Sequence, residues 1–428
     1  MSQKDQMVDR MNTGGRRTSQ RRIRGFVVAA TVLATLVAGA CGSAGSGGAT
    51  SSEAPTSDAQ SASQAPAGSD TSASTADESP TQQAGDDGGV AAAKAIVDEA
   101  MKPAAGWQGP DSAPAPKAGA KVAIISANQG AEGTALIADH MTRAGKVLGW
   151  NTTIFDGQGD PSTQIKALNA AVDGKYDGIV LDILDTRVLQ EGIQRVLEAK
   201  IPVISIGSLK NEPESIPDVS HDWIRAGQLA ADYMIANSPN GAANVLILAD
   251  FEFPAVKDGE YVGITSVLND KTKCPNCKVT EKQFLSKNLT TDPGQLTIAQ
   301  LQDDPTTNWV WCFDACMQQV ATQVAASGIS TQAHGVGMNG LPANLDLIES
   351  GSFQIASIGN PYPFESWATM DNLNRLMNGE PAYDWASALP LRIIDKSNVG
   401  SLTPDDRKIG WIGDVDYETQ FAKLWGSN

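Results

Sequence analysis

From residue 121 onward, short apolar runs alternate with longer stretches in which apolar residues recur at helical spacing. The apolar runs predict strands, and the stretches between them predict helices. The first four predicted strands cover residues 122–125, 152–155, 178–181 and 202–206, and the helices between them cover 131–148, 164–172 and 187–199. Such alternation is typical of βα units, in which helices cover both faces of a parallel sheet.

A second series of the same kind follows a predicted helix over residues 224–235. Its predicted strands cover 245–248, 279–285, 309–311, 335–338 and 354–358, with helices near 256–268, 294–301, 318–326 and 345–350 between them. The chain is therefore predicted to contain two similar α/β sheets in tandem. Ligands bind beyond the carboxyl ends of the strands in open parallel sheets, so two facing sheets would form a cleft lined from both sides.

Residues 1–40 have the pattern of an export signal. Residues 1–24 carry seven basic side chains, and residues 25–40 form an uncharged, largely apolar stretch that ends in small residues before Cys41. This arrangement is typical of a secretory signal peptide. It also resembles a bacterial lipobox, in which the cysteine is lipidated and becomes the new N-terminus, although Ala38 stands where Leu or Val is usual. A plain signal peptide with an incidental cysteine, or an uncleaved anchor, is the alternative.

The segment after Cys41 has the composition of a flexible tether. Residues 42–89 consist almost wholly of Ser, Gly, Ala, Thr, Pro, Gln and acidic residues, and such a segment cannot bury enough apolar surface to fold. Residues 90–101 predict a short helix, and residues 103–116 a proline-rich connector. We therefore assign residues 41–116 to the lipidated cysteine and its tether.

Composition indicates a largely globular chain and excludes two classes of protein. The 428 residues are 41% hydrophobic and 19% charged, enough for two or three domains with sizeable cores. Acidic residues outnumber basic ones by 49 to 32, which gives a formal charge of −17 and argues against a nucleic-acid partner. Only one long apolar run exists, so the chain is not a multi-span membrane protein.

The chain lacks the common catalytic signatures GxSxG, HExxH and GxxxxGK[ST], and its three histidines are widely separated. Residues 335–340 fit GxGxxG, but the first glycines fall inside a predicted strand and no acidic residue follows at the expected spacing. We interpret this motif as a strand that ends in a glycine-rich turn. We therefore expect no cofactor, no metal and no enzymatic activity.

Four cysteines lie in two close pairs in the second series, Cys274 with Cys277 and Cys312 with Cys316. They could in principle bind zinc, or the CxxC pair could be redox-active. However, the first pair precedes a predicted strand and the second follows one, so the pairs should lie at opposite ends of their sheet. In an exported protein we favour two local disulfides.

Aromatic and polar side chains gather where the predicted strands end. The aromatics are Phe251, Phe253, Phe313, Tyr362 and Phe364, and the polar residues are Asn128, Gln129, Asp182, Ser208, Asp222, Asp250, Asp314, Asn339 and Asn360. Sugars and polyols need this mixture, because their C–H faces stack on rings and their hydroxyls hydrogen-bond to carboxylates and amides. The alternative at each position is core packing for an aromatic and a helix N-cap for an aspartate.

From about residue 117 to the C-terminus, the pattern resembles the periplasmic binding proteins of the ribose and galactose type, which are solute-binding components of ABC sugar importers. The resemblance rests on residues 121–126, 176–182, 201–204, 219–222, 337–340 and 356–361. It implies a two-lobed type I fold, in which each lobe is a parallel sheet flanked by helices and a hinge joins the lobes. The first lobe would take residues 117–221 and 360–390, and the second 222–359 and 391–428, with about three crossings between them.

The resemblance also implies residues that line the cleft. They are Gln129, Asp182 and Ser208 in the first lobe, Asp222 at the first crossing, Phe251, Phe313 and Asn339 in the second lobe, and Asn360 at the crossing back. With Asn128 and Asp250 they form the predicted ligand-binding set. The family often has two aromatics in the first loop and a basic residue after the first strand of the second lobe. Here residues 130–133 contain no aromatic and Lys257 only approximates the basic position, which argues against a ribose-like ligand.

We therefore expect a monomeric lipoprotein, anchored by lipid alone to the outer face of the cell membrane, that presents a sugar or polyol to an ABC permease. A ligand-sensing module for a signalling receptor is an alternative, since the same cleft would serve it. An exported glycoside hydrolase that uses Asp182 and Asp250 is another, but no spacing fixes an acid–base pair. A repressor of the same fold is disfavoured, because the tether stands in place of a DNA-binding headpiece.

Overall fold

The computed structural model describes residues 87–427. The predicted signal peptide, the lipidation of Cys41 and most of the tether lie outside the described residues. No helix within 87–427 is long and apolar enough to cross a membrane.

The first sheet has five parallel strands in the order β2-β1-β3-β4-β5. They are β1 (Lys121–Ser126), β2 (Asn151–Asp156), β3 (Gly178–Asp182), β4 (Val203–Ile206) and β5 (Asp218–Val219). The flanking helices are α2 (Glu132–Val147), α3 (Pro161–Asp173), α4 (Gln190–Glu198) and α10 (Tyr362–Met377), with the short 3₁₀ helix η1 (Thr186–Val188) before α4. The first four strands and the helices between them confirm the predicted βα units.

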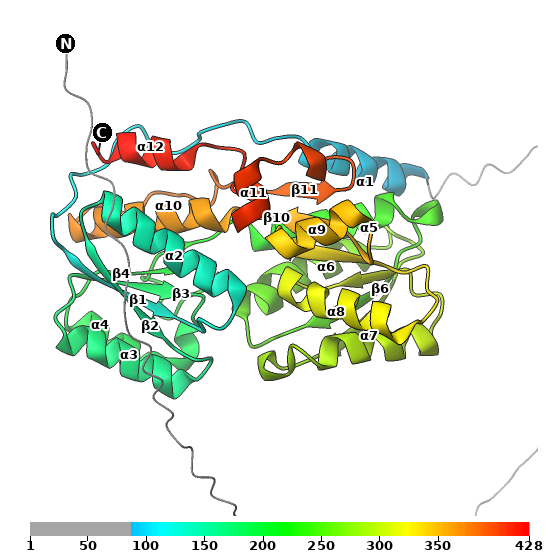
Figure 1. Ribbon diagram of the computed structural model, residues 1–428, viewed down its shortest axis with the longest axis horizontal. Coiled ribbons are helices and arrows are strands. Elements are labelled where there is room, and N and C mark those ends of the chain that lie inside the picture. The colour runs from blue at the N-terminus through cyan, green and yellow to red at the C-terminus, as the bar shows by residue number, and fades with distance from the viewer. Residues whose placement is uncertain (1–86, 428) are drawn as a thin grey trace, which may run out of the picture. The chain divides into compact units, whose positions relative to one another are not determined.

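Alternate side chains of the first sheet enter different cores, as the period of two along a strand requires. Ile124 and Val180 pack with α2 and α10, whereas Ile125 and Leu181 pack with α3 and α4. Figure 1 shows these two pairs of helices on opposite sides of the sheet. Both faces are therefore covered, as the continuous apolar strands predict.

The second sheet has six strands in the order β11-β10-β9-β8-β6-β7. They are β6 (Asn244–Ala249), β7 (Lys278–Gln283), β8 (Trp309–Trp311), β9 (His334–Asn339), β10 (Gln354–Gly359) and β11 (Arg392–Asp395). The flanking helices are α5 (Trp223–Ala236), the π-helix η3 (Ala255–Glu260), α6 (Tyr261–Leu268), α7 (Asp292–Asp303), α8 (Asp314–Ser327) and α9 (Pro342–Ser350), with 3₁₀ helices η2 (Pro239–Gly241) and η4 (Ser286–Asn288). The five predicted strands are confirmed. Strand β11, which pairs antiparallel with β10, was not predicted.

The C-terminal part of the chain divides between the two lobes. Strand β11 and the helices η5 (Val399–Ser401) and α11 (Pro404–Ile409) stay with the second sheet, where α11 packs on α9. Helix α12 (Tyr417–Leu424) instead packs on α10 of the first lobe. Its aromatic side chains recur every fourth position and enter the first core: Tyr417, Phe421 and, just beyond the helix, Trp425. The expected boundary, which gave all of 391–428 to the second lobe, therefore differs from the structure at its C-terminal end.

Residues 87–116 belong to the folded body, whereas the sequence assigned them to the tether. Helix α1 (Asp87–Ala100) packs on α5 and buries Ala93 and Val97 in the second core. The following segment reaches the first lobe, where the Trp107 ring lies 5.1 Å from the Phe421 ring and 5.7 Å from the Phe364 ring. An apolar stripe on α1, the Trp107 ring, and hydrogen bonds from Asn374 and Arg375 to the carbonyls of Pro114 and Ser112 hold this segment on the body, although its composition is tether-like.

The structure confirms the two predicted local disulfides. Cys274 and Cys277, just before β7, have Cα atoms 5.4 Å apart, and Cys312 and Cys316, just after β8, have Cα atoms 5.9 Å apart. Within residues 87–427, no group of three or more His, Cys, Asp or Glu side chains could hold a metal ion.

Candidate ligand-binding site

Asp182 ends strand β3 at the centre of the first sheet and is completely buried. Among residues 87–427, neither of its carboxylate oxygens has a hydrogen bond of ordinary geometry. Burial raises the pKa of this carboxyl to about 8, and the nearby Ser126 hydroxyl acts in the opposite direction. A buried acid without a partner is unusual in a protein interior and marks this strand end as a candidate site.

Tyr362, the first residue of α10, lies where groups from both lobes meet. Its phenol oxygen accepts a hydrogen bond of 2.9 Å from Nδ2 of Asn339, which ends strand β9 of the second sheet. Burial raises the pKa of Tyr362 well above its ordinary value, and the carboxylates of Glu365, Glu260 and Asp182 raise it further. The phenol is therefore within electrostatic reach of three acids. We call these residues the Tyr362 cluster: Tyr362, Asp182, Glu260, Glu365 and Asn339, together with Asn360, His221 and Trp223, which are described below.

Asn339 is held in a backbone conformation that few residues adopt. Its φ is +112°, and the following Gly340 has φ +70°. Its side-chain amide also donates to Oδ1 of Asn360, 3.2 Å away, while Nδ2 of Asn360 is buried and has no hydrogen bond of ordinary geometry within residues 87–427. Non-glycine residues with positive φ concentrate at functional sites, and here the strain places one amide beside both Asn360 and Tyr362.

A buried pair joins the first crossing between the lobes to α10. Nδ1 of His221 lies 2.6 Å from Oε1 of Glu365, and the His221 backbone N–H donates to the same oxygen at 3.2 Å. The imidazole ring centre is 3.9 Å from that of Trp223. Three polar atoms of these residues remain buried without partners, namely Nε2 of His221, Oε2 of Glu365 and Nε1 of Trp223.

Glu260 brings a second unpartnered acid to the cluster from the second lobe. It ends the π-helix η3, is 1% exposed, and has no partner for Oε2. Burial, with a smaller contribution from Asp314, raises the pKa of Glu260 to about 8. Single-turn π-helices are frequent at functional sites. Sequence reasoning missed Glu260, because the predicted helix over 256–268 also contains Lys257 and Asp258 and its pattern does not single out one acid.

The structure brings three of the predicted ligand-binding residues together in the Tyr362 cluster: Asp182, Asn339 and Asn360. Gln129 lies next to it, because its amide donates to the Ser126 hydroxyl at 2.8 Å. Sequence reasoning also missed the roles of His221 and Glu365, and it named Tyr362 only as one of several aromatics.

The other predicted residues of the first lobe and the crossing use their polar atoms for local structure. Oδ1 of Asn128 accepts from the Gly130 backbone at 2.9 Å, and the Ser208 hydroxyl donates to the Leu184 carbonyl at 2.9 Å. Asp222 is exposed and caps α5 by accepting from the Arg225 backbone at 2.8 Å.

The predicted residues at the ends of β6 and β8 contact other side chains of the second lobe. The Phe251 ring lies 5.2 Å from Tyr261, and Phe313 lies 6.2 Å from Phe253. Asp250 accepts from the Ser286 hydroxyl and the Glu252 backbone, and burial raises its pKa to about 6. These contacts fit packing and loop support, and the ligand-binding role of these three residues stays a prediction.

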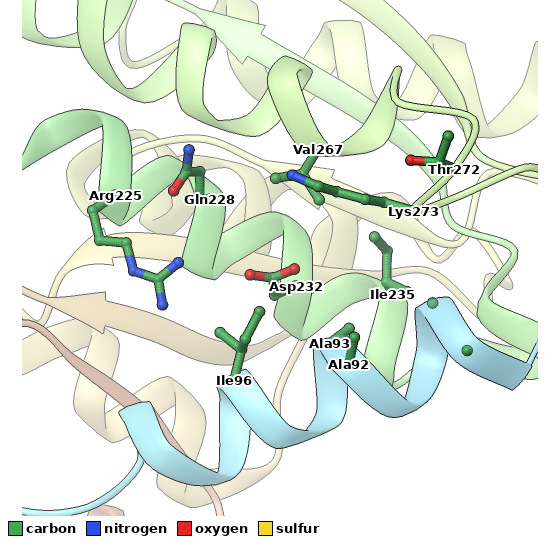
Figure 2. A pocket seen from close by; sticks show the side chains of 12 residues that line it. Ala92, Ala93, Ile96, Arg225, Gln228, Asp232, Ile235, Val267, Thr272 and Lys273 are labelled. Atoms are coloured by element: carbon green, nitrogen blue, oxygen red, sulfur yellow. The ribbon is translucent and has the colours of Figure 1, made fainter.

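A separate cavity of about 240 Å³ lies between α1, α5 and α6 (Figure 2). Its lining is largely apolar, but Asp232 of α5 points into it between Arg225 and Lys273. Burial raises the pKa of Asp232 to about 6, while the two cations act in the opposite direction. This cavity shares no residue with the Tyr362 cluster.

Residues 122–381 match the family described as periplasmic binding protein domain. The chain belongs to this family. Membership confirms the two-lobed type I α/β fold that the sequence resemblance implied. No curated protein matches the chain.

Solved structures support the same fold. A solute-binding protein of an ABC transporter from Agrobacterium vitis, with bound allitol, aligns with a TM-score of 0.59 at 19% identity, over 66% of this chain and 97% of its own. The myo-inositol binding protein of Caulobacter gives 0.59 at 17% identity, over 69% and 98%. A solute-binding protein from Mycobacterium smegmatis with bound glycerol gives 0.58 at 18% identity, over 66% and 96%. At these identities the similarity shows the fold alone.

Proposed function

We propose that this protein captures a small hydroxyl-rich solute, a sugar or a polyol, between its two lobes and delivers it to an ABC permease. The observation that carries the proposal is the set of buried polar atoms in the Tyr362 cluster that have no hydrogen-bond partner among residues 87–427. They are Oδ1 and Oδ2 of Asp182, Oε2 of Glu260, Oε2 of Glu365, Nδ2 of Asn360, Nε2 of His221 and Nε1 of Trp223. Buried polar groups are normally satisfied, so a ligand rich in hydroxyls accounts for them.

The two lobes contribute to the cluster in a way that suits capture by closure. Asp182 comes from the first sheet, and Glu260 and Asn339 come from the second lobe. A ligand that bonds to both sets gains affinity only when the lobes are close together, and so it shifts the population toward that arrangement. The solved relatives whose descriptions name allitol and myo-inositol support ligands of this class.

Membrane attachment is the second part of the proposal. The lipobox-like sequence before Cys41 supports a protein that is anchored by acyl chains outside the membrane. A Cys41→Ala variant should then be released into the medium, which fractionation and immunoblotting would detect. Retention of the variant on cells would contradict the anchor.

Binding is tested by calorimetry and small-angle scattering with a panel of pentoses, hexoses, pentitols, hexitols and inositols. We expect at least one compound to bind with micromolar or better affinity and to reduce the radius of gyration. Tyr362→Phe removes the oxygen that holds Asn339 and should weaken binding at least ten-fold. Tyr383→Phe is the matched control, because the Tyr383 hydroxyl donates to the Gln108 carbonyl outside the cluster.

A panel without binding or compaction would overturn the proposed function. Delivery to a permease is tested separately, by uptake of the radiolabelled ligand in cells that lack this protein. Unchanged uptake alongside tight binding would refute the importer role and leave the binding role in place.

A further inference from the structure

Asp314, the first residue of α8, is a completely buried acid on which donors from two other elements converge. Its Oδ2 accepts from the backbone N–H of Leu341, just before α9, at 2.9 Å. Its Oδ1 accepts from Nε2 of Gln354 in β10 at 3.0 Å. The hydroxyl of Ser357, also in β10, lies 3.1 Å from both carboxylate oxygens. One side chain of α8 therefore joins strand β10 to the start of α9.

These contacts hold the turn that directly follows Asn339. The Gly340 backbone N–H donates to the Ser357 hydroxyl at 3.1 Å, and the Leu341 backbone N–H donates to Asp314 itself. Both backbone amides after Asn339 are thus bound to the same carboxylate, one directly and one through a hydroxyl. Asn339 has φ +112°, a conformation that persists only where the surrounding structure imposes it. The contacts of Asp314 supply this constraint.

The glycine motif over residues 335–340 makes room for the carboxylate. A Cβ atom at Gly337 would overlap Oδ1 of Asp314 and Nε2 of Gln354. A Cβ atom at Gly335 would first meet the sulfur of the flexible Met317 side chain. Glycine inside a strand often marks the close approach of another group. The second glycine of the motif is therefore explained by the position of Asp314 against strand β9.

The network around Asp314 differs from the Tyr362 cluster in that its polar atoms are satisfied. Nδ2 of Asn344 donates to the main-chain carbonyl of Asp314 at 2.9 Å and to Oε1 of Gln354 at 2.6 Å. Asp314, Asn344, Gln354 and Ser357 are all completely buried, and none of their side-chain polar atoms lacks a partner among residues 87–427. A fully satisfied buried network is rigid. It therefore suits support of the site and not direct contact with a solute.

We infer that Asp314 is a positioning residue, whose carboxylate holds the turn after Asn339 so that the Asn339 amide faces Tyr362 and Asn360. The inference rests on the proposed function, in which Asn339 is a ligand-binding residue. The amide lies 2.9 Å from the Tyr362 oxygen and 3.2 Å from Oδ1 of Asn360, so a small rotation of the turn would break both contacts. Binding sites lose affinity when the residues that support them become loose.

The first test is a double-mutant cycle measured by titration calorimetry. The probes are myo-inositol, allitol, sorbitol, glucose and ribose, and the one that binds the wild type most tightly is used throughout. Asp314→Asn keeps the shape of the side chain but leaves one N–H donor without an acceptor, because Leu341 and Gln354 donate to different oxygens. We expect it to weaken binding at least ten-fold. In the Asn339→Gly protein, whose binding is already weak, it should weaken binding less than three-fold, because the amide is already gone.

The second test needs no solute. In protein labelled with ¹⁵N-asparagine, the pair of side-chain amide signals that Asn339→Gly removes belongs to Asn339. Asp314→Asn should shift this pair, because the amide would leave the oxygens of Tyr362 and Asn360. Asp371→Asn is the matched control: Asp371 is also a completely buried acid, bound at 2.8 and 2.9 Å, but to Arg375 and Trp425 in the first lobe. It should leave the affinity and the Asn339 signals unchanged.

Two milder variants keep the test decisive if Asp314→Asn does not fold. Ser357→Ala removes the hydroxyl between Asp314 and the Gly340 N–H, and Gly337→Ala displaces the carboxylate. Each should weaken binding and shift the Asn339 signals. Gly335→Ala, two positions away on the same strand, should change the affinity less than three-fold.

The possible results separate this inference from the proposed function. If Asp314→Asn weakens binding equally with and without the Asn339 side chain, it acts on the whole fold and the inference is wrong. Unchanged Asn339 signals in Asp314→Asn would also overturn it. If no probe binds the wild type, the proposed function fails, and the signals of the solute-free protein still decide whether Asp314 positions Asn339.

Discussion

Replacing Asp182 with asparagine should flatten the dependence of stability on pH in the ligand-free protein. The folded protein keeps the Asp182 proton up to a pKa of about 8, whereas the unfolded chain loses it near the ordinary value of 3.8. The raised pKa therefore contributes stability that is fully present below pH 3.8 and is lost as the pH rises toward 8. Asparagine does not titrate, so the variant lacks this contribution.

The magnitude follows from the size of the shift. A difference of about 4 pKa units, at about 1.4 kcal/mol per unit, sets a ceiling of about 6 kcal/mol on the stability lost between pH 4 and pH 8. Water can reach a charged site when the lobes separate, which lowers the cost of ionisation. We therefore expect Asp182→Asn to remove about 2–3 kcal/mol of the stability that the wild type loses between pH 4 and pH 8. Glu260 and Asp314, whose pKa values burial also raises, contribute to the loss that persists in the variant.

Urea denaturation at pH 4.5, 6, 7 and 8.5, followed by tryptophan fluorescence, measures this effect. The unfolding free energy of the wild type should fall over this range, and that of Asp182→Asn should fall less, so that the variant is the more stable protein at pH 8.5. Asp222→Asn is the control, because Asp222 is exposed and asparagine caps a helix as well as aspartate does. Parallel curves for wild type and Asp182→Asn would refute the argument.

Three further predictions concern the salt bridge between the lobes, the packing of α1 and the backbone of Asn339. Arg187→Ala removes the salt bridge to Asp258 between the lobes. Both side chains are about one-third exposed, so the substitution should weaken ligand binding by no more than about five-fold in calorimetry. Ala93→Glu buries a charge under α1 and should cost about 2–4 kcal/mol in thermal denaturation, whereas Ala92→Glu on the exposed side of the same helix should cost little. Asn339→Ala must hold φ +112° without the amide that bonds to Tyr362, so it should lose about 1–3 kcal/mol of stability, while Asn339→Gly should regain part of that loss without restoring binding.

The alternation of apolar strands and amphipathic helices was sufficient to predict most of the fold. The pattern does not predict an element that is very short or whose position depends on packing against distant parts of the chain. Strand β5 has only two residues, and β11 is polar at both ends, so neither has a periodicity that can be recognised. Helices α1 and α12 have modest apolar stripes, and their positions are decided by the surfaces of α5 and α10, which are assembled from distant parts of the chain.

The residues of the candidate site divide in the same way, into those that the strand pattern locates and those that depend on distant packing. Asp182 and Asn339 directly follow the predicted strands 178–181 and 335–338, and Asn360 lies two residues beyond the predicted strand 354–358, so topology alone locates them. The position of Glu260 depends on a π-helix and on how the second lobe lies against the first. Sequence periodicity specifies neither. Phe251 and Phe313 were assigned to ligand because they follow strands; their partly exposed rings contact Tyr261, Phe253 and Phe284, and the assignment stays a prediction.

The position of Tyr362 links ligand recognition to the movement of the lobes. Asn360, which bonds to Asn339, lies in the crossing that leads directly into α10, and the aromatic ring of Tyr362 is part of the first core while its phenol is bound by the second lobe. A change in the angle between the lobes therefore alters the distance between the phenol and Asn339. The residues that would bind the solute therefore also change their mutual distances when the lobes move. A ligand that bonds to groups of both lobes would stabilise one arrangement of the lobes.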